Sequence, residues 1–180
     1  MKLTVKAPLF FLLVAIILSV FSSACGGTPK VSAEELCLSL NELFPDTDRG
    51  AVMLSDKASE DESGVFSPLT DQTIGRLYTG LYEPPSCRSR IDACAVRLPI
   101  DESGFEIHVL CALNPSDVQE ITALLDRRLQ KMKSAEILQY APDEYKPHYE
   151  NAEIFTKGNY VFLLATPDNT AAKKLIREKL

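Results

Sequence analysis

The chain has 180 residues and a formal net charge of −6 at pH 7, with 25 acidic against 19 basic side chains. This acidic balance argues against nucleic acid as a partner and against a face that binds anionic lipid headgroups. Without its N-terminal signal, the chain is long enough for one hydrophobic core, and we therefore expect residues 31–180 to form a single domain.

Residues 1–27 have the order of an export signal. Lys2 and Lys6 give a basic start, residues 10–20 are almost unbroken apolar sequence, and the small residues SSACGG (22–27) follow. Basic, then apolar, then small residues is the order typical of secreted proteins. The apolar run is shorter than the roughly 20 residues that a permanent span requires. The sequence predicts a signal at 1–24, lipid attachment at Cys25 and a tether at 25–30.

The segment FSSACG (21–26) resembles a bacterial lipobox followed by its usual glycine, although Ser22 stands where Leu is common. The resemblance implies a processed chain that begins at Cys25 and carries a diacylglycerol and a further acyl group such as palmitate. Two or more acyl chains hold a protein stably on a membrane. This places the domain on the extracytoplasmic face of the cell membrane. Simple secretion after cleavage at Ala24 is the alternative, since Ser22 and Ala24 also fit a small-x-small rule.

Four segments have the apolar spacing of amphipathic helices. Ser32 followed by Glu35 is the capping-box pattern at the start of the first segment. In the third, apolar residues from Val118 to Met132 form a stripe opposite a charged face. The expected helices cover residues 32–44, 70–80, 116–133 and 171–179.

Five segments have the composition and alternation of strands. Gly158 and Asn159 suit a hairpin turn because both accept positive φ. The strand after this turn is apolar on both faces and should be central and covered. The sequence therefore predicts an α+β domain, with an antiparallel sheet of four or five strands and helices packed mainly on one face. The expected strands cover residues 51–54, 91–98, 105–113, 152–156 and 160–166.

Four cysteines remain besides Cys25, an even number that permits two disulfides in an exported chain. A hairpin turn centred between residues 102 and 103 would place Cys94 opposite Cys111 on one face of the sheet, within reach of a bridge. Cys37 and Cys87 would then pair by elimination. Four buried free thiols is the alternative, and the sequence leaves it open.

Metal and cofactor sites have no support in the sequence. His108 and His148 have no partners at ligand spacing, and no CxxC motif is present. Arg88, Arg90 and Arg97 lie near strand ends, and we expect solvated charges rather than an anion site. The sequence indicates neither a bound metal nor a cofactor.

Aromatic residues gather in the C-terminal third. The candidate binding surface consists of Tyr140, Glu144, Tyr145, His148 and Tyr160, which could line a pocket for a sugar or a peptide. The alternative is that Gly158 and Asn159 serve the turn and that the tyrosines cover the core.

The same block carries a family resemblance. Residues YAPDE (140–144), NAEI (151–154) and KGNYV (157–161) are similar to a bacterial lipoprotein family known as domain of unknown function 4358. The likeness extends over residues 31 to 180. It implies export and lipid anchoring, and it supplies no activity, cofactor or catalytic residue.

The sequence favours a membrane-anchored domain that binds an envelope or membrane protein, or an envelope ligand, without catalysis. An accessory subunit of a membrane complex is a further possibility. The rival is an envelope hydrolase that uses acidic residues or the Tyr/His cluster. A serine or cysteine nucleophile needs a histidine base held by a third group, and the two histidines offer no signature for that arrangement.

Overall fold

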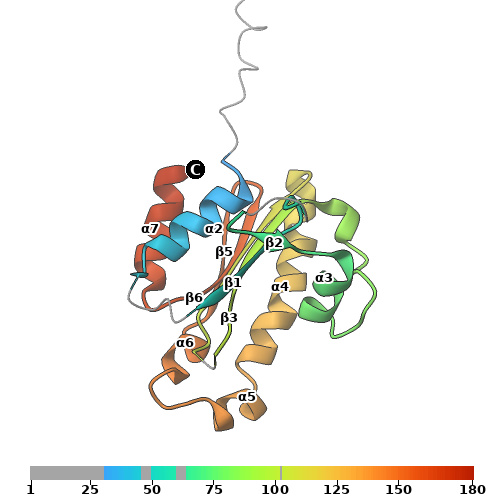
Figure 1. The fold of residues 1–180 in the computed structure, drawn as a ribbon. Helices are drawn as coiled ribbons and strands as arrows, with labels where there is room; N and C mark the ends of the chain where they lie inside the picture. The colour runs from blue at the N-terminus through green and yellow to red at the C-terminus, as the bar shows by residue number, and fades with distance from the viewer. Residues whose placement is uncertain (1–30, 46–49, 60–63, 102) are drawn as a thin grey trace, which may run out of the picture. The chain divides into compact units, whose positions relative to one another are not determined.

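The computed structural model describes residues 31–45, 50–59, 64–101 and 103–180. The predicted signal at 1–24, Cys25 and the tether at 25–30 lie outside the described residues. Residues Val31–Leu180 form one compact unit of α+β architecture (Figure 1).

A six-stranded mixed sheet runs through this unit, in the order β2-β1-β3-β4-β6-β5. Strands β1 and β2 run parallel, and the other four neighbouring pairs are antiparallel. The sequence predicted four or five antiparallel strands, and the two-residue β2 is too short to show an alternating pattern. The strands are β1 (Ala51–Ser55), β2 (Ser67–Pro68), β3 (Ile91–Pro99), β4 (Glu106–Ala112), β5 (Glu153–Lys157) and β6 (Tyr160–Ala165).

Helices cover both faces of this sheet (Figure 1). On one face lie α2 (Ala33–Glu42) and α7 (Asn169–Lys179), and on the other lie α3 (Asp71–Tyr78) and α4 (Val118–Met132). The prediction placed helices mainly on one face. The difference arises because β4 and β6 are buried along their whole length, so each presents apolar side chains to two separate cores.

Local capping explains where the main helices begin. The Ser32 hydroxyl accepts a hydrogen bond from the Glu35 amide at 3.0 Å, as predicted, and the Thr70 hydroxyl accepts one from Thr73 at 3.2 Å. Helix α4 begins later than expected. The turn η3 (Pro115–Asp117) precedes it, and Asp117 rather than Ser116 bonds back to Asn114.

Two short helices lie on either side of a turn at residues 143–145. Helix α5 (Ala135–Tyr140) begins at Ser134, and α6 (Lys146–Glu150) follows after a short connection. Figure 1 shows both at one end of the domain, beyond the C-terminal part of α4. We call this the α5–α6 end.

The β3–β4 hairpin forms where the sequence predicts it, but with a different register. Cys94 pairs with Leu110 rather than with Cys111, a shift of one residue. Because side chains alternate along a strand, this shift moves Cys94 to the α3/α4 face and leaves Cys111 on the α2/α7 face. The predicted pairing of Cys94 with Cys111 on one face is therefore wrong.

Cys37 and Cys87, the second predicted pair, also lie on opposite faces of the sheet. Cys37 belongs to the core under α2, and Cys87 to the core under α3 and α4. Among the described residues Cys37, Cys87, Cys94 and Cys111 are all free and buried. The structure therefore corresponds to the alternative of four buried thiols.

Candidate functional site

The predicted aromatic cluster is divided between distant parts of the fold. Tyr160 is buried on the α2/α7 face, where its hydroxyl donates to the Val31 carbonyl. Tyr160 pairs with Cys111, whereas the opposite end of β6 pairs with Glu106. Tyr160 thus lies away from the α5–α6 end and does not contribute to a shared site there.

The other members of the cluster gather at the α5–α6 end. Tyr145 stacks on His148, with ring centroids 6.1 Å apart. His148 Nδ1–H donates to the Ser103 carbonyl at 2.8 Å and ties α6 to the β3–β4 connection. Glu144 is exposed, and the side chain of Tyr140 projects into solvent with 77% of its surface exposed.

Two adjoining hollows open at this end of the domain. The first, which we call the charged hollow, has a volume of about 260 Å³ and lies between the β3–β4 connection, α4 and α6. The second, the tyrosine hollow, has a volume of about 200 Å³ and lies beside α5. Both include Ile137 and Tyr149, so they share a wall. The charged hollow is lined by Pro99, Asp101, Glu106, Arg128, Lys131, Met132, Ile137 and Tyr149, and the tyrosine hollow by Glu136, Ile137, Tyr140, Ala141 and Tyr149.

A chain of hydrogen bonds runs from the charged hollow into the core. Arg128 donates through Nε and Nη2 to the two oxygens of Glu106, with Nε 3.0 Å from Oε2. Glu106 Oε2 lies 2.9 Å from His108 Nε2, and His108 Nδ1 lies 2.8 Å from the Tyr78 hydroxyl. Glu106, His108 and Tyr78 are all buried, so the hollow meets this chain at Glu106 and Arg128.

Burial and neighbouring charges fix the protonation of this chain. Burial opposes ionisation of Glu106, but the bond from His108 and the charge of Arg128 outweigh it and lower the pKa of Glu106 to about 2. Burial lowers the pKa of His108 below its ordinary value despite the adjacent carboxylate. His108 is therefore neutral at pH 7. Its Nε2–H donates to Glu106, and its Nδ1 accepts from Tyr78.

The sequence analysis did not predict that Arg128, Glu106, His108 and Tyr78 form a hydrogen-bonded chain. The available signal was the alternation of Glu106 and His108 with apolar residues in an otherwise buried strand. Two ionisable side chains on one covered face require partners from the elements packed above them. Tyr78 of α3 and Arg128 of α4 provide those partners.

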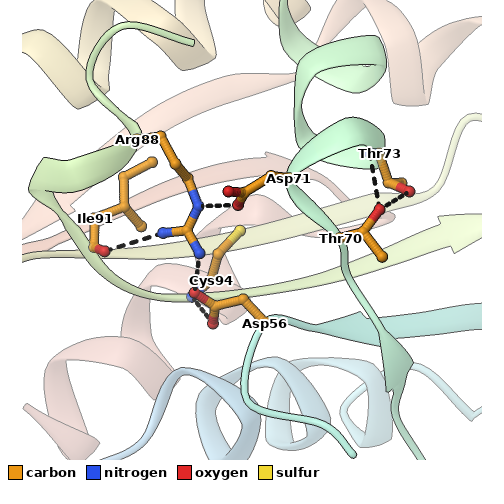
Figure 2. A network of polar contacts seen from close by, with 7 residues as sticks. All are labelled: Asp56, Thr70, Asp71, Thr73, Arg88, Ile91 and Cys94. Carbon is orange, nitrogen blue, oxygen red and sulfur yellow. Dashed lines mark hydrogen bonds and ion pairs between the residues drawn. The ribbon is translucent and has the colours of Figure 1, made fainter. Parts of the chain in front are cut away.

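A second polar network lies around Arg88 and joins three elements (Figure 2). Arg88 Nη2 lies 3.0 Å from Asp56, Nε lies 2.7 Å from Asp71, and Nη1 donates to the Ile91 carbonyl at 3.2 Å. Asp56 also accepts from the Cys94 amide at 2.8 Å. All three guanidinium nitrogens are engaged within the fold, so this network is structural.

The three arginines for which we expected solvated charges behave differently from one another. Arg90 pairs with Glu120 at the surface, as expected for an exposed charge. Arg97 is buried on the α2/α7 face, where Nε donates to Asn41 at 2.9 Å and the guanidinium carbon lies 3.8 Å from the Phe105 ring centroid. The expectation is wrong for Arg97, which joins α2 to the sheet, and for Arg88, whose guanidinium is bound within the fold.

Comparisons with known proteins add no functional assignment: no protein-family model, no curated protein and no solved structure matches this chain. In the described part of the chain, no helix combines the length and the apolar character needed to cross a membrane. The described residues also contain no group of three or more His, Cys, Asp or Glu side chains arranged for a metal ion.

Proposed function

We propose that this chain is a lipoprotein-type domain, anchored through Cys25 on the extracytoplasmic face of the cell membrane, that binds a partner protein without catalysis. The signal pattern of residues 1–27 supports the anchoring. The α5–α6 end supports the binding role.

The observation that carries the binding role is the exposure of large apolar side chains around the two hollows. Tyr140 is 77% exposed, and Ile100, between two residues that line the charged hollow, is 66% exposed. Apolar groups clustered beside polar ones at a surface mark sites of protein association. Tyr140 lines the tyrosine hollow with Ile137 and Tyr149, and the adjoining charged hollow supplies polar groups beside this apolar surface.

The chemistry of the charged hollow also favours binding over hydrolysis. Glu106 is bound by Arg128 and His108 and is ionised at neutral pH, so it has no proton to donate to a substrate. His108 is sealed in the core between Glu106 and Tyr78. A general acid or base must reach a reacting atom directly or through one water.

Photo-crosslinking in intact cells tests this function. A photoreactive phenylalanine analogue replaces Tyr140 in the full chain, and the matched control replaces Lys174, an exposed residue of α7. We expect one specific protein adduct at position 140 that is absent at position 174 and is lost when Lys131→Glu is added. Equal adducts at both positions, or none at 140, would refute the proposed binding surface.

A further inference from the structure

The charged hollow and the tyrosine hollow differ in chemistry although they share Ile137 and Tyr149. Two cations of α4 and the carboxylates of Asp101 and Glu106 line the first, whereas Ile137, Ala141 and two tyrosine rings, with Glu136 beside them, line the second. A ligand that fills both must therefore carry a charged or polar group directly beside an apolar one. Their volumes, about 260 and 200 Å³, suit the end of a chain rather than a long segment.

Arg128 has a donor that the fold does not use. Its Nε and Nη2 bind Glu106, whereas Nη1 forms no hydrogen bond. Among the described residues no buried side-chain nitrogen or oxygen lacks a partner, so Nη1 is accessible to solvent. Arg88 provides the contrast, because all three of its nitrogens are engaged within the fold.

Lys131 adds a second cation to the same hollow. It lies three residues after Arg128 on α4, a spacing that places both side chains on one face of the helix. Lys131 is exposed and forms no ion pair with a described carboxylate. Arg128 neutralises the charge of Glu106, and His108 is uncharged. The hydrogen-bonded chain of these residues therefore has no negative charge left to balance the ammonium of Lys131.

Asp101 is the remaining charged group on the rim of the hollow. One of its carboxylate oxygens accepts a hydrogen bond from the Ser103 amide at 3.0 Å, which places it within the β3–β4 connection. The cationic residues that line the hollow are Arg128, with Nη1 not bonded to Glu106, and Lys131. Donors of this kind bind carboxylates through charge-assisted hydrogen bonds.

We propose that this end of the domain captures the C-terminal carboxylate of its partner protein, with an apolar last side chain in the tyrosine hollow. The carboxylate binds Arg128 Nη1 and Lys131, and the side chain packs on Ile137, Tyr140 and Tyr149. Because Glu106 holds the guanidinium in place before binding, little conformational freedom is lost. This inference rests on the proposed function and names the part of the partner that is recognised.

Peptide binding to the full chain in detergent micelles tests the inference. The probe is a fluorescent peptide that ends in Gly-Ala-Leu with a free carboxylate, compared with its C-terminal amide and with a form that ends in Asp. We expect the Leu acid to bind about tenfold more tightly than either, since one charge-assisted bond is worth about that factor. Equal binding of acid and amide, or no binding of the acid at millimolar concentration, overturns the inference.

Variants and a competitor locate the contact. Lys131→Gln should reduce the preference for the acid over the amide several-fold, whereas Lys174→Gln on α7 should leave it unchanged. Octanoate carries a carboxylate on an apolar chain without a peptide, and it should displace the probe only weakly. Displacement by octanoate as strong as by unlabelled peptide would refute recognition of a protein terminus.

The partner-binding function and the capture of a C-terminal carboxylate can be refuted independently. If the Tyr140 crosslink forms in cells but the peptides bind without regard to their terminus, the partner-binding function stands and terminal capture is wrong. If the peptide acid binds selectively but no protein is crosslinked at Tyr140, terminal recognition stands and the proposed partner function is wrong.

Discussion

Arg128 and Glu106 join helix α4 to strand β4 through two hydrogen bonds between one guanidinium and one carboxylate. The carboxylate is buried, and it also accepts from His108, which continues the chain to Tyr78 of α3. One side of the sheet is thereby tied to both helices that cover it. The same two residues line the charged hollow, so the fold and the candidate site depend on one interaction.

Glu106→Gln should destabilise the domain strongly. The substitution removes the negative charge opposite Arg128 and leaves a largely buried cation without its partner. We expect the free energy of unfolding to fall by about 3 kcal/mol, within the range for loss of one member of a buried pair. Urea unfolding followed by circular dichroism measures this loss.

The matched control is Glu120→Gln, which breaks the half-exposed pair with Arg90. Because solvent screens that pair, the expected change is less than about 1 kcal/mol. Equal losses in the two variants would contradict the structural role assigned to Glu106.

The stability of the domain should fall with decreasing pH in two steps. The pKa of His108 is lowered in the fold, so below its ordinary value of 6.5 the unfolded chain binds a proton that the folded chain does not. The pKa of Glu106 falls from 4.5 to about 2, and its stabilising contribution is lost as the pH drops through this second window. Arg128 and Tyr78, which face these groups, keep their protons throughout both windows.

His108→Gln separates the two steps. Glutamine removes the titrating imidazole, so the slope of unfolding free energy against pH should flatten between pH 6.5 and 5, while the fall below pH 4.5 remains. The slope, rather than the absolute stability, is the readout, because the variant also loses hydrogen bonds to Glu106 and Tyr78. An unchanged slope would show that His108 does not titrate as inferred.

Sequence reasoning located the elements better than the contacts between them. Ser32, Thr70 and Gly158 are local signals, and the helix starts and the turn that they predict are present. The β3–β4 register depends on how the six residues between Pro99 and Glu106 are distributed, and no local signal determines this. An error of one residue there was enough to exchange the faces of Cys94 and Cys111.

The candidate site was only partly predictable for the same reason. Tyr145 and His148 are close in sequence and stack in the fold, and Tyr140 ends the neighbouring helix α5. Arg128 and Glu106 come from different elements, and their meeting depends on how α4 crosses the sheet. Tyr160 was grouped with the wrong residues. It lies at the end of β6 that pairs with Cys111, whereas Glu106 pairs with the opposite end of this strand.

Gly75→Ala should destabilise the domain although alanine favours helices. A Cβ at position 75 would lie 2.2 Å from the Glu83 carbonyl oxygen and 2.7 Å from that of Leu81, so α3 would have to move away from the following loop. We expect a loss of about 1–3 kcal/mol, as for other overpacked sites. Gln72→Ala, at an exposed position of the same helix, should change stability by less than about 0.5 kcal/mol. Thermal unfolding of the three proteins in parallel distinguishes these outcomes.

The four cysteines of the described residues should behave as buried thiols. Burial raises the pKa of Cys94 to about 12, so almost none of it is the reactive thiolate at neutral pH. We expect Cys37, Cys87, Cys94 and Cys111 to resist a maleimide in the folded protein and all to react after unfolding without reductant. Non-reducing peptide mapping should find the peptides of Cys94 and Cys111 separate, and a joined pair would contradict the observed register.

Cys25→Ala should abolish incorporation of labelled palmitate into the chain. The small residues that precede Cys25 predict that its sulfur carries the diacylglycerol, and removing this sulfur removes the attachment point. Cys37→Ala is the matched control, because Cys37 is buried under α2 and should leave labelling intact. Labelling and membrane fractionation of the three proteins, expressed at equal levels, distinguish the outcomes. If Cys25→Ala keeps its label, the lipid is attached elsewhere; if the unaltered chain takes up no label and appears in the medium, simple secretion after Ala24 replaces the anchored form.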